Sequence, residues 1–203
     1  MLKSRLCIAF FAFAVGCAPA QKPLTDYVNP MLGTATLWDS VDLGFKPTKR
    51  TWGAEVFPGS SLPNAMVQVS PVTKFHSGAG YQYEDSVIYG FTHTNKGHWN
   101  LCHIPLLPVT GTPTPGDYCS PFSHERESAA PGYYQVFLDR YGVDAQLSST
   151  LRCAFHKYTY PAGAAASLLA DLQRSNEHVR AWDIRKEGDN VFAGWQQTGE
   201  KMY

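Results

Sequence analysis

Six carboxyl groups are the side chains of this sequence that could carry out acid–base chemistry. Hydrolysis assisted by a general acid and a general base needs two such groups at a fixed separation, with room for a water molecule between them. No two candidates stand at a spacing that would force this arrangement, so we assign no catalytic residue. We interpret Asp85 as the cap of a turn. The candidates are Glu55, Glu84, Asp85, Asp117, Glu125 and Glu127.

Three histidines recur every five residues, at His93, His98 and His103. This spacing does not align them on one helix face, and Gly97 favours a loop. Neutral imidazole can bind zinc, but no acidic or thiolate partner stands at a diagnostic spacing, so we assign no metal site. Contact with a sugar is the better functional interpretation, because imidazole and the indole of Trp99 offer directional hydrogen bonds and an apolar face. Burial with hydrogen bonds to the backbone is the structural alternative.

The cysteines beyond the N-terminal segment are Cys102, Cys119 and Cys153. Their spacing matches no zinc motif. At most one pair of them can form a disulfide, and burial as small apolar side chains is the other interpretation.

The first residues resemble an export signal. Lys3 and Arg5 precede the apolar run from Leu6 to Val15, which is too short to span a bilayer as a stable helix. In one interpretation residues 1–17 end in a lipobox and Cys17 becomes the lipidated first residue, which would attach the protein to a membrane. In the other, Ala18-Pro19-Ala20 is an A-x-A site and cleavage follows Ala20. Both predict an exported bacterial protein, either periplasmic or a cell-surface lipoprotein.

The composition favours an exported all-β domain. The 203 residues suffice for one domain with a core, and the 17 basic side chains balance the 17 acidic ones, so nothing indicates a nucleic-acid partner. Plentiful aromatic residues, glycine and proline, with sparse charge, are typical of loop-rich β structure.

Short strand patterns recur along the chain with turns between them, which predicts an antiparallel β-sandwich. We expect Tyr81–Tyr83 and Val87–Phe91 to form a hairpin, Pro105 and Pro108 to mark an edge strand, and 164–172 to be either a helix or a buried strand. The other expected strands span 65–69, 104–109, 133–138, 143–151, 153–160, 176–186 and 190–197.

Several motifs, in a fixed order, resemble the N-terminal domain of glycoside hydrolase family 92, the calcium-dependent exo-acting α-mannosidases. They cover nearly all of the chain after the export signal. They are Val28-Asn29-Pro30 with Gly33-Thr34, Phe57-Pro58-Gly59, Met66–Pro71, Gly80–Asp85, Gly90–Thr94, Ser123–Val136 and Leu151–His156.

The resemblance implies that residues 24–203 are part of an N-terminal β-sandwich domain, incomplete at its C-terminus. An α/α-barrel domain would follow and would hold the general acid, the general base and most ligands of a calcium ion. The whole protein would then remove terminal α-linked mannose from glycans with inversion, while the isolated fragment would be inactive. A β-sandwich module that binds glycans without hydrolysing them, and a purely structural sandwich, are the alternatives.

The resemblance also places an aromatic side chain near the sugar, in the loop before Gly80. This chain has Phe75 where the family commonly has Trp, and the run from Asn95 to Asn100 departs from the common His-Leu-Ser-Gly-Thr-Gly. Both departures put the usual α-1,2 linkage preference in doubt. The residues that we expect to contact sugar are Phe75, His76, His93, His98 and Trp99.

Overall fold

The computed structural model describes residues 21–36, 44, 55–95 and 101–199. The predicted export signal, Cys17, His98 and Trp99 lie outside these residues, so their assignments stay predictions. Within the described part, no helix is both long and apolar enough to cross a membrane.

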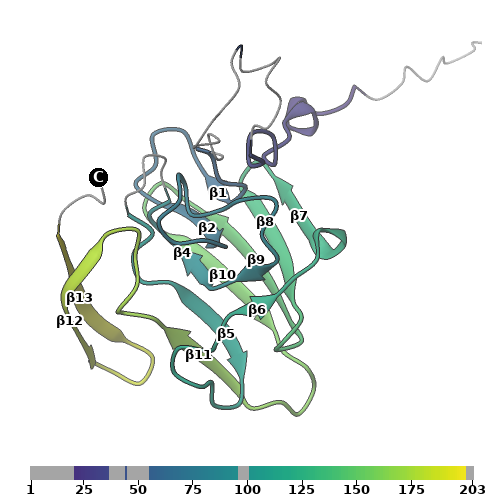
Figure 1. Ribbon diagram of the computed structural model, residues 1–203. Helices are drawn as coiled ribbons and strands as arrows, with labels where there is room; N and C mark the ends of the chain where they lie inside the picture. The colour runs from purple at the N-terminus through teal and green to yellow at the C-terminus, as the bar shows by residue number, and fades with distance from the viewer. Residues whose placement is uncertain (1–20, 37–43, 45–54, 96–100, 200–203) are drawn as a thin grey trace, which may run out of the picture.

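Two antiparallel sheets form a sandwich (Figure 1). The first sheet has the order β1-β2-β4-β5-β11 and consists of β1 (Ser60–Ser61), β2 (Gln68–Val72), β4 (Gly90–Thr92), β5 (Leu106–Thr110) and β11 (Ala166–Ala170). The second has the order β10-β9-β8-β7 and consists of β7 (Glu127–Ala130), β8 (Tyr133–Leu138), β9 (Val143–Ser149) and β10 (Ala154–Thr159).

Two small antiparallel pairs complete the strands. The long hairpin of β12 (His178–Lys186) and β13 (Phe192–Gly199) lies to one side of the sandwich (Figure 1). The pair of β3 (Val87–Ile88) and β6 (Ser120–Pro121) is shorter. The described helical turns are two 3₁₀ turns, η1 (Leu24–Tyr27) and η2 (His124–Arg126).

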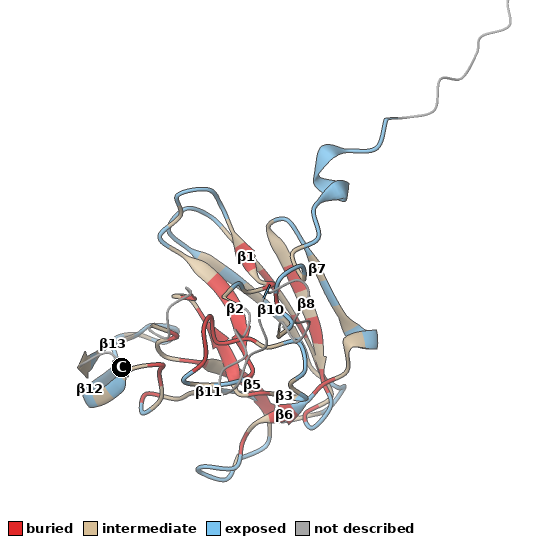
Figure 2. Ribbon diagram, turned by 45° about the horizontal axis from the view of Figure 1, so that its top comes forward, coloured by how far each residue is buried: buried red, intermediate tan, exposed pale blue. Residues whose placement is uncertain are grey.

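The core lies between the two sheets because their strands alternate apolar and polar side chains. Buried and half-buried residues alternate along β8 and β9, as expected of strands with one face toward the interior. Tyr134, Val136 and Leu138 of β8 pack in one cluster with Val69 of β2 and Phe91 of β4. Buried residues therefore line the facing sides of the sheets (Figure 2), whereas exposed and half-buried residues predominate on the β12–β13 hairpin.

The all-β sandwich predicted from the sequence is confirmed, and most expected strands are present within a few residues. The ambiguous segment 164–172 forms strand β11, not a helix, although this strand is largely exposed. The charged stretch before Pro131, where we expected no strand, contains β7, which pairs with β8.

The predicted edge position of the Pro105–Pro108 strand is wrong. Strand β5 lies between β4 and β11, with Pro108 opposite Leu168 of β11. Proline is tolerated there because the register of β5 with β4 contains one residue pair, Phe91 and Leu106.

The predicted hairpin of Tyr81–Tyr83 with Val87–Phe91 is also wrong. Residues 81–83 form no strand, while β3 pairs with β6 and β4 pairs with β2. The physical reason is that backbone amides of this stretch bond elsewhere. The Tyr83 amide donates to the Thr34 carbonyl at 3.0 Å, and the Gln82 amide donates to the Thr73 hydroxyl at 2.9 Å. The Tyr81 ring is fully enclosed, and its hydroxyl donates to the Glu127 carboxylate at 2.9 Å.

Candidate functional site

A cavity of about 570 Å³ opens between the first sheet and the β12–β13 hairpin. Its wall on the sheet side comes from the loop after β2 and from Tyr89, which joins β3 to β4. Its other wall is the segment between β11 and β12, together with the start of β12. The lining residues are Thr73, Lys74, Phe75, His76, Tyr89, Gln173, Arg174, Ser175, Glu177, His178 and Val179.

Phe75 and His76, two of the residues expected to contact sugar, meet in this cavity. The Phe75 ring packs against Tyr89 with centroids 5.5 Å apart and a tilt of 54°. His76 has a left-handed backbone (φ 60°), and its amide donates to the Asn176 side-chain oxygen at 2.8 Å. The cavity therefore offers an apolar aromatic wall beside a partly exposed imidazole.

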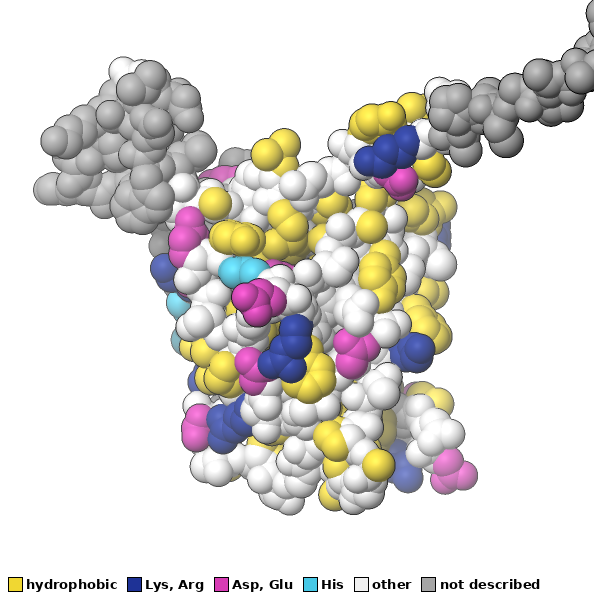
Figure 3. Space-filling view, turned by 90° about the vertical axis from the view of Figure 1, so that its right-hand side faces the viewer, with side chains coloured by type: hydrophobic (Ala, Val, Ile, Leu, Met, Phe, Trp, Pro, Cys, Tyr) yellow, Lys and Arg dark blue, Asp and Glu magenta, His cyan; other side chains and the backbone are white. Residues whose placement is uncertain are grey.

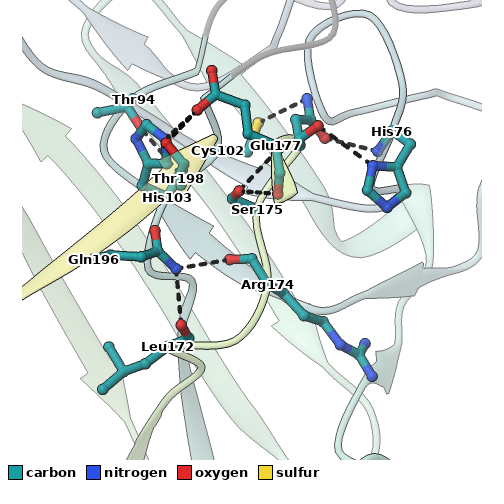
Figure 4. A network of polar contacts seen from close by, with 11 residues as sticks. His76, Thr94, Cys102, His103, Leu172, Arg174, Ser175, Glu177, Gln196 and Thr198 are labelled. Carbon is teal, nitrogen blue, oxygen red and sulfur yellow. Dashed lines mark hydrogen bonds and ion pairs between the residues drawn. The ribbon is translucent and has the colours of Figure 1, made fainter. Parts of the chain in front are cut away.

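Glu177 stands at the edge of the cavity with its carboxylate already engaged (Figure 4). Oε2 accepts a hydrogen bond from Thr198 at 2.6 Å and lies 3.3 Å from Nε2 of His103. Burial alone would raise the pKa of this carboxyl, but the hydrogen bonds from Thr198 and His103 outweigh it and lower the pKa. Glu177 is therefore a carboxylate at neutral pH and does not have the raised pKa of a general acid.

Arg174 divides this cavity from a neighbouring one of about 470 Å³ that it also lines. The guanidinium lies over the rings of Tyr89 and Tyr118, 5.6 and 5.3 Å from their centroids. Its Nε is 3.5 Å from the Asp171 carboxylate. These contacts fix a cation between two aromatic faces, where its remaining N–H groups can donate to a ligand.

The candidate carboxyl groups are dispersed and have different partners. Asp85 accepts from the Thr73 hydroxyl, which itself accepts from the Gln82 amide, so this carboxylate braces a turn as expected of a cap. Burial raises the pKa of Asp85. Glu84 accepts from Thr36, and Asp117 pairs with Arg140.

Glu127 is the most buried of these carboxylates and belongs to a closed cluster. Its side chain is 1% exposed and accepts from the hydroxyls of Tyr81 and Tyr134. His124 Nδ1 lies 2.5 Å from the Glu127 carboxylate, and its Nε2 lies 2.7 Å from the Tyr83 carbonyl oxygen. Burial, and then the neighbouring charge of Glu127, raises the pKa of Tyr81. Because two hydroxyls and an imidazole already surround its carboxylate, we interpret Glu127 as structural.

His93 does not line the cavity. Its Nε2 lies 2.8 Å from Nε2 of His156 on β10, and its carbonyl accepts from the Gln68 amide. Burial lowers the pKa of both imidazoles, that of His156 to about 4. Contact of His93 with sugar stays a prediction, and the structure joins this residue to the other sheet.

The described residues do not form a metal cage. No group of three or more His, Cys, Asp and Glu side chains gathers among them. His93 and His103, which a zinc site would have to bring together, face His156 and Glu177 respectively. Calcium needs six to eight oxygen ligands, so this part of the chain does not fit that ion by itself.

Cys102, Cys119 and Cys153 are all free thiols. Cys102 is buried between the segments that carry Ala79 and Asn176, and burial raises the pKa of its thiol to about 12. Of the two interpretations of the cysteines, the structure thus supports small buried side chains for Cys102.

Sequence reasoning missed the segment that forms the far wall of the cavity. Gln173 to His178 is a run of six polar residues that follows strand β11 and ends at the first residue of β12. A polar cluster in a connection of a rigid sandwich is a general sign of a binding loop, and this run could have been identified on that ground.

Acidic and basic side chains occur close together on the face of the molecule in Figure 3. That face shows no broad area of one sign, in keeping with the formal net charge of zero.

Comparison with protein families matches residues 27–203 to the glycosyl hydrolase family 92 N-terminal domain. No curated protein matches the chain. Among solved structures, the chain is similar to a family GH92 α-mannosidase from Bacteroides thetaiotaomicron in complex with mannoimidazole. The TM-score is 0.74 and the identity 29%, over 86% of this chain and 23% of the mannosidase chain.

A GH92 inverting mannosidase from the same species gives a TM-score of 0.59 and 27% identity, over 75% of this chain and 20% of that one. A third GH92 glycosyl hydrolase gives a TM-score of 0.58 and 28% identity, over 71% of this chain and 22% of that one. The chain thus spans about a quarter or less of the length of these enzymes.

Proposed function

Because the chain belongs to glycoside hydrolase family 92, we propose that it supplies one wall of the sugar pocket of an exported α-mannosidase. The observation that carries this proposal is the cavity in which Phe75 and His76 meet. Two of the solved structures that the chain resembles are an α-mannosidase and an inverting mannosidase. We infer that the substrates are mannose-containing glycans and that the sugar removed is terminal and α-linked.

The chemistry of the cavity suits a pyranose. The Phe75 ring offers an apolar face for sugar C–H groups, and the rings of His76 and His178 offer directional hydrogen bonds beside it. Arg174 adds donors held between two aromatic rings. A few convergent polar groups on an apolar wall are typical of small-molecule sites.

The chemical step requires residues outside this chain. Four of the six candidate carboxyls are individually engaged, with Thr36, Thr73, Arg140 or the Tyr81–Tyr134 cluster. We infer that the general acid and base of an inverting mechanism, and most calcium ligands, lie in a C-terminal α/α-barrel domain of the full-length protein. Calcium would there act on bound sugar hydroxyls, and the residues described here would orient the sugar and exclude water.

We further propose export, through the signal at residues 1–17, to the periplasm or the cell surface. Lipid on Cys17 would hold the protein at a membrane, and cleavage after Ala20 would release it. Mass spectrometry of the mature N-terminus distinguishes the two, because a lipidated protein begins at Cys17.

The decisive experiment measures mannose release from an aryl α-mannoside by the full-length protein and by its Phe75→Ala variant. We expect kcat/KM to fall by about 5- to 100-fold, in proportion to the loss of an aromatic contact worth about 1–3 kcal/mol. Phe155→Ala is the matched control, because Phe155 is 67% exposed on β10 and does not line the cavity. An equal fall in both variants would contradict the assignment.

A glycan-binding module without hydrolysis is the second candidate, favoured by the dispersed carboxyls of the described residues. It predicts that the full-length protein binds mannose-containing glycans and releases no mannose. In that case Phe75→Ala would weaken binding alone, and the assay above would register no turnover for either protein.

A further inference from the structure

Four of the five non-glycine residues with positive φ among the described residues lie in two short segments that meet. His76 (φ 60°) is in the loop after β2, while Leu101 (φ 64°), Cys102 (φ 55°) and Ile104 (φ 49°) precede β5. Left-handed backbone is unfavourable for residues with a Cβ and most unfavourable for a β-branched residue such as Ile104. Such conformations persist only where surrounding contacts determine them, and they concentrate at functional sites.

Asn176 contacts both segments and is fully buried. Its side-chain oxygen accepts from the His76 amide at 2.8 Å, and its side-chain nitrogen donates to the Ser77 carbonyl at 3.1 Å. The same nitrogen lies 3.5 Å from Cys102 Sγ, and the backbone amide of Asn176 donates to the Leu101 carbonyl at 2.9 Å. One residue between β11 and β12 thus bonds to the backbone of both segments.

Further contacts join the two segments at the same place. Cys102 Sγ lies 3.8 Å from the Ala79 carbonyl, and the Cys102 amide donates to the Thr94 carbonyl at 3.1 Å. The His103 amide donates to the Thr94 hydroxyl at 3.1 Å. The segment 101–104 is therefore fixed from both sides, with Asn176 as the link to the loop that carries His76.

We propose that Asn176 is a positioning residue that sets the loop 74–80 and the segment 101–104 in a fixed relation, ready for the sugar. This inference rests on the proposed function, because it assumes that the loop of Phe75 and His76 contacts the glycan. Preorganisation of this kind raises affinity, because the loops lose their conformational entropy when the protein folds and not when the glycan binds.

The test measures amide hydrogen exchange and mannoside kinetics on the full-length protein. Asn176→Ala removes both side-chain bonds, and we expect exchange in 76–80 and 101–104 to accelerate about tenfold, as the loss of a buried hydrogen-bond partner implies. KM for the mannoside should rise about tenfold, with a smaller change in kcat. Asn176→Asp keeps the acceptor for the His76 amide and loses the donor to the Ser77 carbonyl and Cys102 Sγ. Exchange should therefore accelerate around Ser77 and Cys102 while the His76 amide stays protected.

Tyr141→Phe is the matched control. Tyr141 is buried, its hydroxyl donates to the Tyr118 carbonyl at 2.6 Å, and it neither touches the two loops nor lines the cavity. We expect it to lower the melting temperature while exchange in both loops and KM stay unchanged. If Asn176→Ala does not fold, the exchange pattern of Asn176→Asp decides the question.

These outcomes distinguish the positioning role of Asn176 from the proposed sugar pocket. Exchange that is unchanged in both loops, or accelerated equally across the protein and in Tyr141→Phe, overturns the positioning role. Loops that loosen while KM and glycan affinity stay unchanged show that Asn176 fixes the loops, and that the proposed sugar pocket is wrong.

Discussion

The imidazoles of His93 and His156 join the two sheets of the sandwich through an Nε2–Nε2 distance of 2.8 Å. A hydrogen bond between two imidazoles requires one neutral ring to accept. The hydroxyl of Tyr158 lies 2.6 Å from the other nitrogen of His156, and Phe91 packs at its edge. This pair is therefore a contact between sheets whose strength depends on the protonation of its members.

The first prediction is a loss of stability in mild acid that depends on this pair. Burial, and then the neighbouring His93, lowers the pKa of His156 to about 4. The folded state favours the neutral form of His156. Its contribution to the free energy of unfolding is therefore complete at pH values above the unfolded-state pKa of about 6.5, and it declines as pH falls toward the folded-state pKa of about 4. We expect the free energy of unfolding to fall by about 1–2 kcal/mol from this source between pH 7 and pH 4.5.

Denaturant unfolding at both pH values measures this effect. His156→Gln should reduce the difference between the two pH values, because the glutamine does not titrate. His178→Gln, a substitution at an exposed histidine of β12, should leave the difference unchanged. If His156→Gln and wild type decline equally in acid, the loss has another origin.

The second prediction concerns the buried carboxylate of Glu127. Glu127→Gln removes a charged acceptor from the hydroxyls of Tyr81 and Tyr134 and from His124, and it places an amide against donors. We expect a loss of about 2–4 kcal/mol of stability, the cost of an incompletely satisfied buried network. Glu125→Gln on the exposed side of the same turn is the control. Thermal unfolding of both variants measures the effect. Equal melting temperatures would contradict a stabilising role for the Glu127 network.

The sandwich was predictable because alternation is a local property of sequence. Strands β8 and β9 alternate buried and half-buried residues, and each pattern is legible without any knowledge of the partner strand. The stretch from Gly80 to Tyr83 has similar alternation and forms no strand. Its backbone amides bond instead to Thr34 and to the Thr73 hydroxyl, partners that no local pattern reveals.

The candidate site was predictable only in part, for the same reason. The loop of Phe75 and His76 was identifiable from its residue types, and the structure places both in one cavity. Asn176 was not identifiable, because its side chain acts on His76 and Cys102, residues distant in sequence. A polar residue in a polar run gives no sign of whether it faces solvent or holds two buried loops.

The third prediction is that the purified chain of residues 21–203 releases no mannose from an aryl α-mannoside. Glu84, Asp85 and Asp117 are held by separate partners and do not form the spaced pair that inversion requires. The assay is the release of the aryl group at substrate concentrations above the KM of the full-length protein. Turnover that disappears on substitution of an internal Asp or Glu would contradict this expectation.

The last prediction tests how closely Gly80 packs against Cys102. Gly80 ends the loop 74–80, which we expect to contact sugar. Gly80 has φ +84°, and a Cβ there would lie 2.6 Å from Cys102 Sγ. Gly116 has nearly the same φ, +82°, with no atom within 4 Å of its Cβ position. Both Gly→Ala variants therefore carry the backbone cost of a left-handed alanine, about 1–2 kcal/mol, and Gly80→Ala alone carries the overlap with sulfur.

We expect Gly80→Ala to lower the free energy of unfolding by about 1–3 kcal/mol more than Gly116→Ala, the usual cost of overpacking. Cys102→Ala shortens the opposing side chain, so the added cost of Gly80→Ala should largely vanish in that background. A double-mutant cycle from denaturant unfolding gives the coupling directly. Equal costs for the two glycine substitutions, or a coupling near zero, would show that the loop before Tyr81 can move away from Cys102. Packing against Cys102 would then not fix the loop 74–80.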